Sequence, residues 1–199
     1  MIGVLLSGGI DSTALSFMEK PDVAFNINYG QKAAEAERSA SVAICEVLGI
    51  ELIDIDVNCS SLGSGDLVGG AAISTAPESD WWPYRNQLLI TLCVMKAVEL
   101  GCSKLLIGTV KSDQYHTDGT KGFIRKISDL ISYQEGGIIV EAPAIEKTTA
   151  ELVTSSGIPF EILAWSHSCH KANVPCTNCR GCSKHFETLN ELGFYGQQY

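Results

Sequence analysis

The segment that decides the fold is IGVLLSGGIDST, residues 2–13. An apolar run leads directly into a glycine pair, and helical spacing follows from Asp11 to Glu19. A short, continuous apolar run of this kind predicts a buried parallel strand. Glycines in a strand-to-helix turn let backbone N–H groups approach an anion, and the helix N-terminus adds positive partial charge. We therefore expect a phosphate-binding turn directly after the first strand.

Strand-like and helix-like segments alternate along the rest of the chain. We expect further strands at 23–28, 52–57, 104–109 and 138–142, helices at 32–48, 87–100, 123–134 and 148–156, and irregular loops at 59–83 and 111–122. This alternation predicts an α/β fold, a Rossmann-like five-stranded parallel sheet with helices on both faces. Residues 1–163 are expected to form this ATP-binding domain, and residues 164–199 a C-terminal zinc-binding appendage packed on it.

The composition indicates a folded, acidic protein. Of the 199 residues, 45% are hydrophobic, and 14 basic against 23 acidic side chains give a net charge of −9. An acidic surface repels phosphate backbones, so we expect no stable binding of nucleic acid. No apolar run approaches the roughly 18–20 residues that span a bilayer. The N-terminus also lacks the features of a signal peptide, so we expect a cytoplasmic protein without membrane contact.

Four cysteines near the C-terminus follow the pattern C-x6-C-x2-C-x2-C: Cys169, Cys176, Cys179 and Cys182. In a cytosolic chain such a cluster is typical of metal binding, and four thiolates complete the tetrahedral coordination of a structural Zn²⁺. An iron–sulfur cluster is the alternative. His167, His170 and His185 lie close in sequence, but with four thiolates present we expect them not to be ligands.

Hydroxyl groups and a carboxylate accompany the glycine pair. Ser7, Ser12 and Thr13 offer hydroxyls to an anion, whereas Asp11 would repel a phosphate unless Mg²⁺ bridges the two. Capping of the helix by Asp11 or a serine is the simpler alternative. The chain has neither G-x-x-x-x-G-K-[ST] nor G-x-G-x-x-G, which disfavours a Walker-type enzyme and a dinucleotide-binding fold. The string SGGxDS resembles the PP-loop of the ATP pyrophosphatases, which cleave ATP between its α and β phosphates.

Together with the cysteine spacing, several more motifs resemble the 7-cyano-7-deazaguanine synthase family, which belongs to the adenine nucleotide alpha hydrolase-like fold. They are Asn28-Tyr29-Gly30-Gln31, Tyr84-Arg85-Asn86, Ile107-Gly108-Thr109, and Pro143 with Lys147. The resemblance implies an enzyme that uses ATP, Mg²⁺ and Zn²⁺, and that acts as a homodimer on 7-carboxy-7-deazaguanine and ammonia. The implied reaction adenylates the carboxylate, forms an amide with ammonia, and dehydrates the amide to the nitrile after a second activation.

The resemblance also assigns roles to individual residues. The phosphates and Mg²⁺ would be held by Ser7, Gly8, Gly9, Asp11, Ser12 and Thr13. Gly108, Tyr29 and Gln31 would contact the rest of the nucleotide. Catalysis would rest on Asp11, Ser12, Arg85 and Lys147, the last two being cations at the α-phosphate. The substrate would be held by Tyr84, Arg85, Asp113 and Asp118, with Trp81 or Trp82 as further stacking candidates.

The chain departs from the family pattern in the loop after the fourth strand and at two glycine positions. The loop reads DQYHTDGTK over residues 113–121 and lacks the Pro, Cys and Arg of the family's D-x-x-G-Y-P-D-C-R. Tyr84 and Thr177 stand where the family has glycine. Activation chemistry is expected to be retained. The alternatives are a related ligase that joins the activated carboxylate to a protein N-terminus or lysine and, more remotely, a PP-loop tRNA-modifying enzyme.

Overall fold

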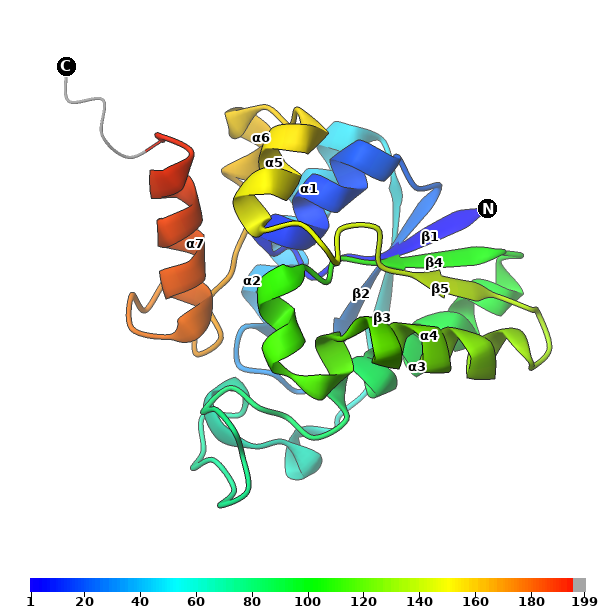
Figure 1. Ribbon diagram of the computed structural model, residues 1–199, viewed down its shortest axis with the longest axis horizontal. Coiled ribbons are helices and arrows are strands. Elements are labelled where there is room, and N and C mark those ends of the chain that lie inside the picture. The colour runs from blue at the N-terminus through cyan, green and yellow to red at the C-terminus, as the bar shows by residue number, and fades with distance from the viewer. Residues whose placement is uncertain (195–199) are drawn as a thin grey trace.

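The computed structural model describes residues 1–194 and contains a five-stranded, parallel sheet (Figure 1). Its order is β3-β2-β1-β4-β5. The strands are β1 (Ile2–Leu5), β2 (Val23–Asn28), β3 (Glu51–Asp56), β4 (Lys104–Ile107) and β5 (Ile139–Glu141). Gly3 of β1 pairs with Val23 on one side and Leu105 on the other. The predicted α/β fold with a parallel sheet is confirmed.

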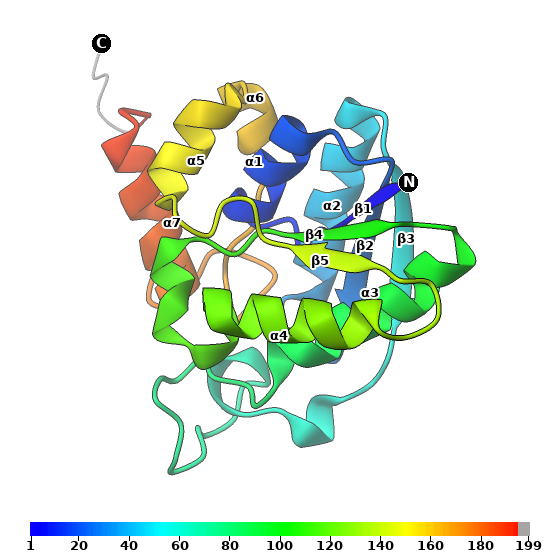
Figure 2. The ribbon, with the colours of Figure 1, turned by 45° about the vertical axis from the view of Figure 1, so that its right-hand side comes forward.

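Helices cover both faces of the sheet. They are α1 (Ile10–Glu19), α2 (Ala34–Leu48), α3 (Arg85–Glu99), α4 (Lys121–Ser132), α5 (Thr149–Ser156), α6 (Phe160–Leu163) and α7 (Arg180–Glu191). Figure 2 shows α3 and α4 on one face and α1, α2 and α5 on the other. The first five helices lie within two residues of the expected bounds, whereas α6 and α7 were not predicted. Among the described residues, no helix has the length and hydrophobicity needed to cross a membrane.

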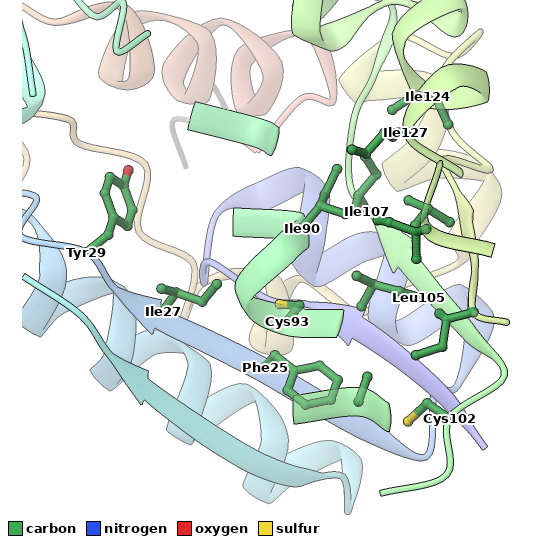
Figure 3. Close-up of a cluster of buried hydrophobic side chains, with 14 of the residues drawn as sticks. Phe25, Ile27, Tyr29, Ile90, Cys93, Cys102, Leu105, Ile107, Ile124 and Ile127 are labelled. Carbon is green, nitrogen blue, oxygen red and sulfur yellow. The ribbon is translucent and has the colours of Figure 1, made fainter. Parts of the chain in front are cut away.

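Alternating side chains of the strands divide the core into two layers. Phe25 and Ile27 of β2 belong to the buried cluster on the side of α3 and α4, which also includes Ile90 and Ile127 (Figure 3). Ala24 of β2 points to the opposite face, into the cluster that includes residues of α1 and α2. Burying an aliphatic or aromatic side chain of this size contributes roughly 1.5–3 kcal/mol. The sheet is therefore a rigid platform, and the loops at its ends carry the polar residues.

The two long polar segments predicted as irregular loops contain only short 3₁₀-helical turns. These turns are η1 (Ser60–Leu62), η2 (Gly65–Leu67), η3 (Lys111–Tyr115) and η4 (Thr117–Gly119). Both segments follow strands, so they lie at the carboxyl edge of the sheet. In this strand order the chain leaves β1 toward β2 and later returns to its other side at β4. Such a switch point leaves a crevice at the carboxyl ends of the strands, where ligands bind in open α/β sheets.

The C-terminal segment folds back on this edge of the sheet. The backbone N–H of His167 donates to the carbonyl of Gly8 at 2.8 Å, and Asn173 contacts Glu35 at the start of α2 at 2.9 Å. Leu189 of α7 joins the core cluster that contains Ile10 of α1. The expected appendage is therefore held against the phosphate-binding turn. Its last five residues, 195–199, lie outside the described part of the chain.

Candidate active site

A cavity of about 520 Å³ lies at the carboxyl ends of β1, β2 and β4. Nine of the fourteen residues predicted to act in catalysis or to bind nucleotide or substrate line it. They are Ser7, Gly9, Asp11, Ser12, Tyr29, Arg85, Gly108, Asp113 and Asp118. Its wall also contains residues from the segment between β3 and α3, from the loop after β4 and from the cysteine-rich segment. Four parts of the chain that are distant in sequence therefore meet at the switch point.

The turn after β1 presents two hydroxyls to the cavity. The Oγ atoms of Ser7 and Ser12 lie 3.2 Å apart, and Ser12 donates to the carbonyl of Gly9 at 3.1 Å. Thr13 is fully buried, and its hydroxyl donates to the same carbonyl at 2.8 Å. Gly8 has a φ of 72°, and a Cβ atom there would lie 2.7 Å from Ala40 of α2. Ser7 and Ser12 are therefore available to an anion, whereas Thr13 and Gly8 shape the turn.

Asp11 in the first turn of α1 carries a carboxylate with one free oxygen. Its Oδ2 accepts a hydrogen bond from the Nζ of Lys184 at 2.8 Å, while its Oδ1 is buried without a hydrogen-bond partner. Burial raises the pKa of Asp11, and the charge of Lys184 opposes this. Oxygen ligands are those that Mg²⁺ prefers. The unpartnered oxygen beside the phosphate-binding turn fits a divalent cation.

Lys184 is a site residue that the sequence did not reveal. It belongs to α7, and its Nζ contacts Asp11 at 2.8 Å and Asp113 at 3.1 Å. Asp113 in turn accepts from the backbone N–H of Val110 at 3.1 Å, so both of its carboxylate oxygens have protein partners. These contacts join positions 173 and 71 residues apart. No local pattern in the sequence could have predicted them.

Arg85 begins α3 at another wall of the cavity. Burial works against its charge, but the neighbouring Tyr29, Asp118 and Asp80 raise its pKa above the ordinary value for arginine. Asp118 is also tied to the next residue of the helix, since its Oδ2 accepts from the backbone N–H of Asn86 at 3.2 Å. The guanidinium therefore remains charged within a group of acidic and phenolic side chains, as an anion-binding role requires.

A buried carboxylate connects the loops around the cavity. Asp80 is 6% exposed. Its oxygens lie 3.3 Å from the Nδ1 of His170 and 3.8 Å from both the Nε2 of His116 and the Nη1 of Arg180. Burial alone would raise the pKa of Asp80, but His170 and Arg180 lower it to about 2. Asp80 therefore gathers side chains from the cysteine-rich segment and from the loop after β4.

Several predicted site residues lie away from the cavity. Gln31 braces the turn after β2, accepting from the N–H of Tyr29 at 2.9 Å and donating to the carbonyl of Ile27 at 3.0 Å. Lys147 contacts Ser155 at 2.6 Å and does not line the cavity wall. The structure therefore does not support direct contact of Gln31 with the nucleotide or of Lys147 with the α-phosphate.

The aromatic residues before α3 also differ from expectation. Tyr84 is 77% exposed on the outer surface. Trp82 is buried in the core, where its ring meets Tyr29 edge-on with centroids 4.9 Å apart. Neither Tyr84 nor the two tryptophans line the cavity. The predicted stacking partners of the substrate are therefore packing or surface residues, because the chain turns sharply between Pro83 and Arg85.

The four predicted metal ligands are brought together. The Sγ atoms of Cys169, Cys176, Cys179 and Cys182 lie within 4.8 Å of one another, and two of the Sγ pairs are 4.0 Å apart. Tetrahedral Zn–S bonds of about 2.3 Å place the sulfurs about 3.8 Å apart, so the group fits one metal ion. Cys179 also caps α7 by accepting from the N–H of Cys182 at 3.4 Å.

The three nearby histidines have other contacts. The Nε2 of His167 lies 3.0 Å from the carbonyl of Ala172, and the Nδ1 of His185 lies 3.1 Å from the hydroxyl of Ser168. His170 faces Asp80. The expectation that four thiolates, and not imidazoles, form the cluster agrees with this arrangement.

The parallel sheet, the SGGxDS turn at its switch point and the four-cysteine cluster define a PP-loop protein of the α/β class. The chain belongs to the family of the queuosine biosynthesis protein QueC, whose model matches residues 2–193.

Curated relatives of the chain carry the name 7-cyano-7-deazaguanine synthase. The protein of that name from Methanocaldococcus jannaschii is 28% identical, with 90% of each chain covered. The one from Chlorobium phaeovibrioides is 30% identical over 96% of this chain and 92% of its own length. Among solved structures, the U34-tRNA thiolase NcsA from Methanococcus maripaludis, with its [4Fe-4S] cluster, matches with a TM-score of 0.56 at 16% identity. That match covers 97% of this chain and 66% of the thiolase, and it shows a common fold.

Proposed function

We propose that the protein uses ATP to convert 7-carboxy-7-deazaguanine and ammonia into 7-cyano-7-deazaguanine, with release of AMP and pyrophosphate. The observation that carries this proposal is the convergence of Ser7, Asp11, Ser12 and Arg85 on one cavity, in a chain that matches the QueC family from residue 2 to residue 193. It is therefore an AMP-forming ligase that makes carbon–nitrogen bonds.

The chemistry explains why ATP is cleaved at its α-phosphate. A carboxylate does not react with an amine at neutral pH, because oxide is a very poor leaving group. When the carboxylate oxygen attacks the α-phosphorus, the bond to the β-phosphate breaks and pyrophosphate leaves. Ammonia then attacks the acyl carbon, AMP leaves and a proton passes to solvent. In a second round the amide oxygen attacks the α-phosphorus of another ATP and pyrophosphate leaves. Departure of AMP and loss of both protons of the amide nitrogen to solvent then yield the nitrile.

The cavity contains groups suited to these steps. The hydroxyls of Ser7 and Ser12 and the first N–H groups of α1 would bind phosphate oxygens. Arg85 would stabilise the charge that develops at the α-phosphate during both attacks. Asp11 would hold Mg²⁺, which supplies charge neutralisation when bound. A Zn²⁺ ion at the four cysteines would be structural, because four thiolates leave no open coordination position.

Recognition of the deazaguanine ring of the substrate requires hydrogen-bond acceptors for the N–H groups at the edge of that ring. Asp113 is less suited to this than expected, since Lys184 and Val110 occupy its oxygens. Asp118 and the carbonyls at the end of β4 line the same cavity and supply acceptors. We expect adenylation to fail with the analogue that lacks the 2-amino group, because an unpaired buried acceptor costs about 1–3 kcal/mol.

One assay tests the proposal. The protein is incubated with ATP, Mg²⁺, 7-carboxy-7-deazaguanine and ammonium, and AMP and the product mass are measured. We expect AMP and the nitrile. A product that stops at the amide, or a protein that gains the mass of the acyl group, would favour the alternative amine acceptor. Absence of stimulation by the deazapurine carboxylate would contradict the proposed substrate. We also expect a homodimer, which light scattering tests. We expect it in the cytoplasm, which cell fractionation tests.

A further inference from the structure

Lys184 links the helix that follows the cysteines to the phosphate-binding turn. Its Nζ lies 2.8 Å from Oδ2 of Asp11 and 3.1 Å from Oδ1 of Asp113, and its side chain is 27% exposed. It also lines the cavity with Ser7 and Ser12. A lysine ammonium is a compact charge with three donors, so it can exchange carboxylate partners for phosphate oxygens without a change of backbone.

The charge balance of the cavity calls for such a cation. Six carboxylates line the wall, against three basic side chains other than histidine. Two of these three, Arg85 and Arg180, have Asp80 as a charged neighbour, away from the turn. Among the described residues, Lys184 is the basic side chain in contact with the turn itself. The positive charges that would neutralise a triphosphate at the turn are therefore Lys184 and any divalent cation held by Asp11.

We propose that Lys184 binds the phosphates of ATP, and that its ammonium and a divalent cation compete for the carboxylates of Asp11 and Asp113. This inference rests on the proposed function, because it assumes that ATP binds in this cavity. When the cation takes the carboxylates, the ammonium is released toward the phosphate oxygens beside Ser7 and Ser12. Lys184 is therefore a catalytic residue that stabilises the departing pyrophosphate.

The cysteine cluster positions this lysine. Cys179 caps α7 and Cys182 lies in its first turn, so Lys184 follows the last predicted metal ligand by two residues. Gly181 is packed so closely that a Cβ atom there would lie 1.9 Å from the carbonyl oxygen of Ser168. The first turn of α7 is thus fixed on both sides. A metal ion at the cysteines would therefore set the position of Lys184, a phosphate ligand 71 residues beyond Asp113 in the chain.

Two probes with opposite expected responses test the inference. Mn²⁺ alone reports on the two carboxylates through its electron paramagnetic resonance signal, and α,β-methylene-ATP with Mg²⁺ reports on phosphate binding by calorimetry. In Lys184→Met the ammonium no longer competes for the carboxylates, so Mn²⁺ should bind about tenfold more tightly. The nucleotide analogue should bind about tenfold more weakly, because a charge-assisted hydrogen bond is lost.

Lys171→Met is the matched control. Lys171 also lies in the cysteine-rich segment and pairs with an acid, Asp66 at 3.4 Å, but it does not line the cavity. Both affinities should match those of the wild type in this control, and Lys184→Arg should retain most of the binding of the analogue. Bound zinc is measured in every variant, so that a loss of the cysteine-rich fold is recognised directly.

The opposite shifts cannot arise from a general loss of structure, which would weaken binding of both probes. Unchanged affinities in Lys184→Met, or shifts of both probes in the same direction in Lys184→Met and Lys184→Gln, would overturn the inference. Neither probe requires the deazapurine. If 7-carboxy-7-deazaguanine fails to stimulate AMP formation while the opposite shifts occur, the proposed reaction is wrong and the role of Lys184 in phosphate binding stands.

Discussion

Gly108 at the end of β4 lies directly against Ser12 of α1. A Cβ atom on Gly108 would be 2.9 Å from the Cα of Ser12 and 3.0 Å from its backbone nitrogen. Backbone atoms cannot move aside as the tip of a flexible side chain can. The absence of a side chain at Gly108 therefore lets β4 and the phosphate-binding turn meet at the switch point of the sheet.

Gly108→Ala is expected to displace the start of α1. We predict a loss of about 1–3 kcal/mol in the free energy of unfolding, as in other overpacked sites, and weaker binding of ATP. Urea unfolding and calorimetry measure the two effects. In Gly122→Ala, a control at the start of α4, the added Cβ atom meets nothing closer than 3.9 Å. An unchanged ATP affinity in Gly108→Ala would contradict the close approach described above.

Ser12→Ala and Asp11→Ala are expected to abolish pyrophosphate release, with a loss of at least about 100-fold, the effect of removing an oxyanion donor. Both side chains line the cavity wall, so the fold should survive. Ser16→Ala is the control for Ser12, because Ser16 is a buried serine of the same helix whose hydroxyl donates to the carbonyl of Ser12 and which does not line the cavity. Full ATP turnover in either cavity variant would rule out the phosphate-binding role of the turn.

The cysteine cluster is expected to hold one zinc ion per chain. Cys176→Ser or Cys179→Ser should lose the metal and several kcal/mol of stability, because metal binding and folding are coupled in such modules. Elemental analysis of freshly purified protein checks this. Cys59→Ser, which lies outside the cluster, should keep the metal. Zinc retained in both cluster variants would argue against the site, and visible charge-transfer absorption would identify an iron–sulfur cluster.

Two residues occupy a left-handed backbone conformation that favours glycine. Tyr84 has a φ of 56° and Thr177 a φ of 63°, and both stand where the resembling family has glycine. Tyr84→Gly and Thr177→Gly should each stabilise the protein by about 1 kcal/mol, because a left-handed backbone costs roughly 1–2 kcal/mol for other residues. Chemical unfolding measures this. Tyr84→Ala, which keeps the strain, should give no gain, and equal stability of the Gly and Ala variants would contradict the explanation.

The surroundings of His116 predict that the stability depends on pH. Burial lowers the pKa of His116 below 6.5, with Asp80 and Asp118 opposing and Arg180 and Arg85 adding to the shift. Its Nε2 must accept from Arg180 at 3.0 Å, which requires the neutral ring. The unfolded chain therefore binds more protons below pH 6.5, and stability falls as the pH drops.

The wild type should lose more stability than His116→Gln when the pH is lowered from 7.5 to 5.5. Unfolding in urea at the two pH values measures the difference. Bound zinc is measured in both proteins at both pH values, so that loss of metal in acid is distinguished from titration of the imidazole. An equal loss in the two proteins would show that His116 takes up no additional proton on unfolding, which would contradict the prediction.

The sheet, the phosphate-binding turn and the cysteine cluster were predictable because each depends on a local pattern. The apolar run before Ser7 predicts a buried strand, and the cysteine spacing predicts the group of four thiolates that the structure contains. Helix α7 escaped prediction because the turn-rich residues between Cys169 and Cys179 dominate that region. Its apolar positions, such as Leu189, are few.

Residues whose place depends on long-range packing could not be assigned from the sequence. Lys184 and Asp80 reach the cavity through contacts between segments that are distant in the sequence. Lys147 was expected there because, with Pro143, it matches a motif of the resembling family, but its side chain turns to Ser155 of α5. The direction of a side chain at the end of a helix or strand depends on its neighbours in the tertiary structure, and a local sequence pattern does not reveal those neighbours.

The most direct test of the proposed reaction follows the oxygen atoms of the substrate. 7-Carboxy-7-deazaguanine labelled with ¹⁸O in its carboxylate is incubated with the protein, ATP, Mg²⁺ and ammonium, and the AMP is analysed by mass spectrometry. If the carboxylate and then the amide oxygen attack the α-phosphorus, each AMP released carries one ¹⁸O atom and the nitrile carries none. Unlabelled AMP, with the label found in water or phosphate, would contradict activation by adenylation.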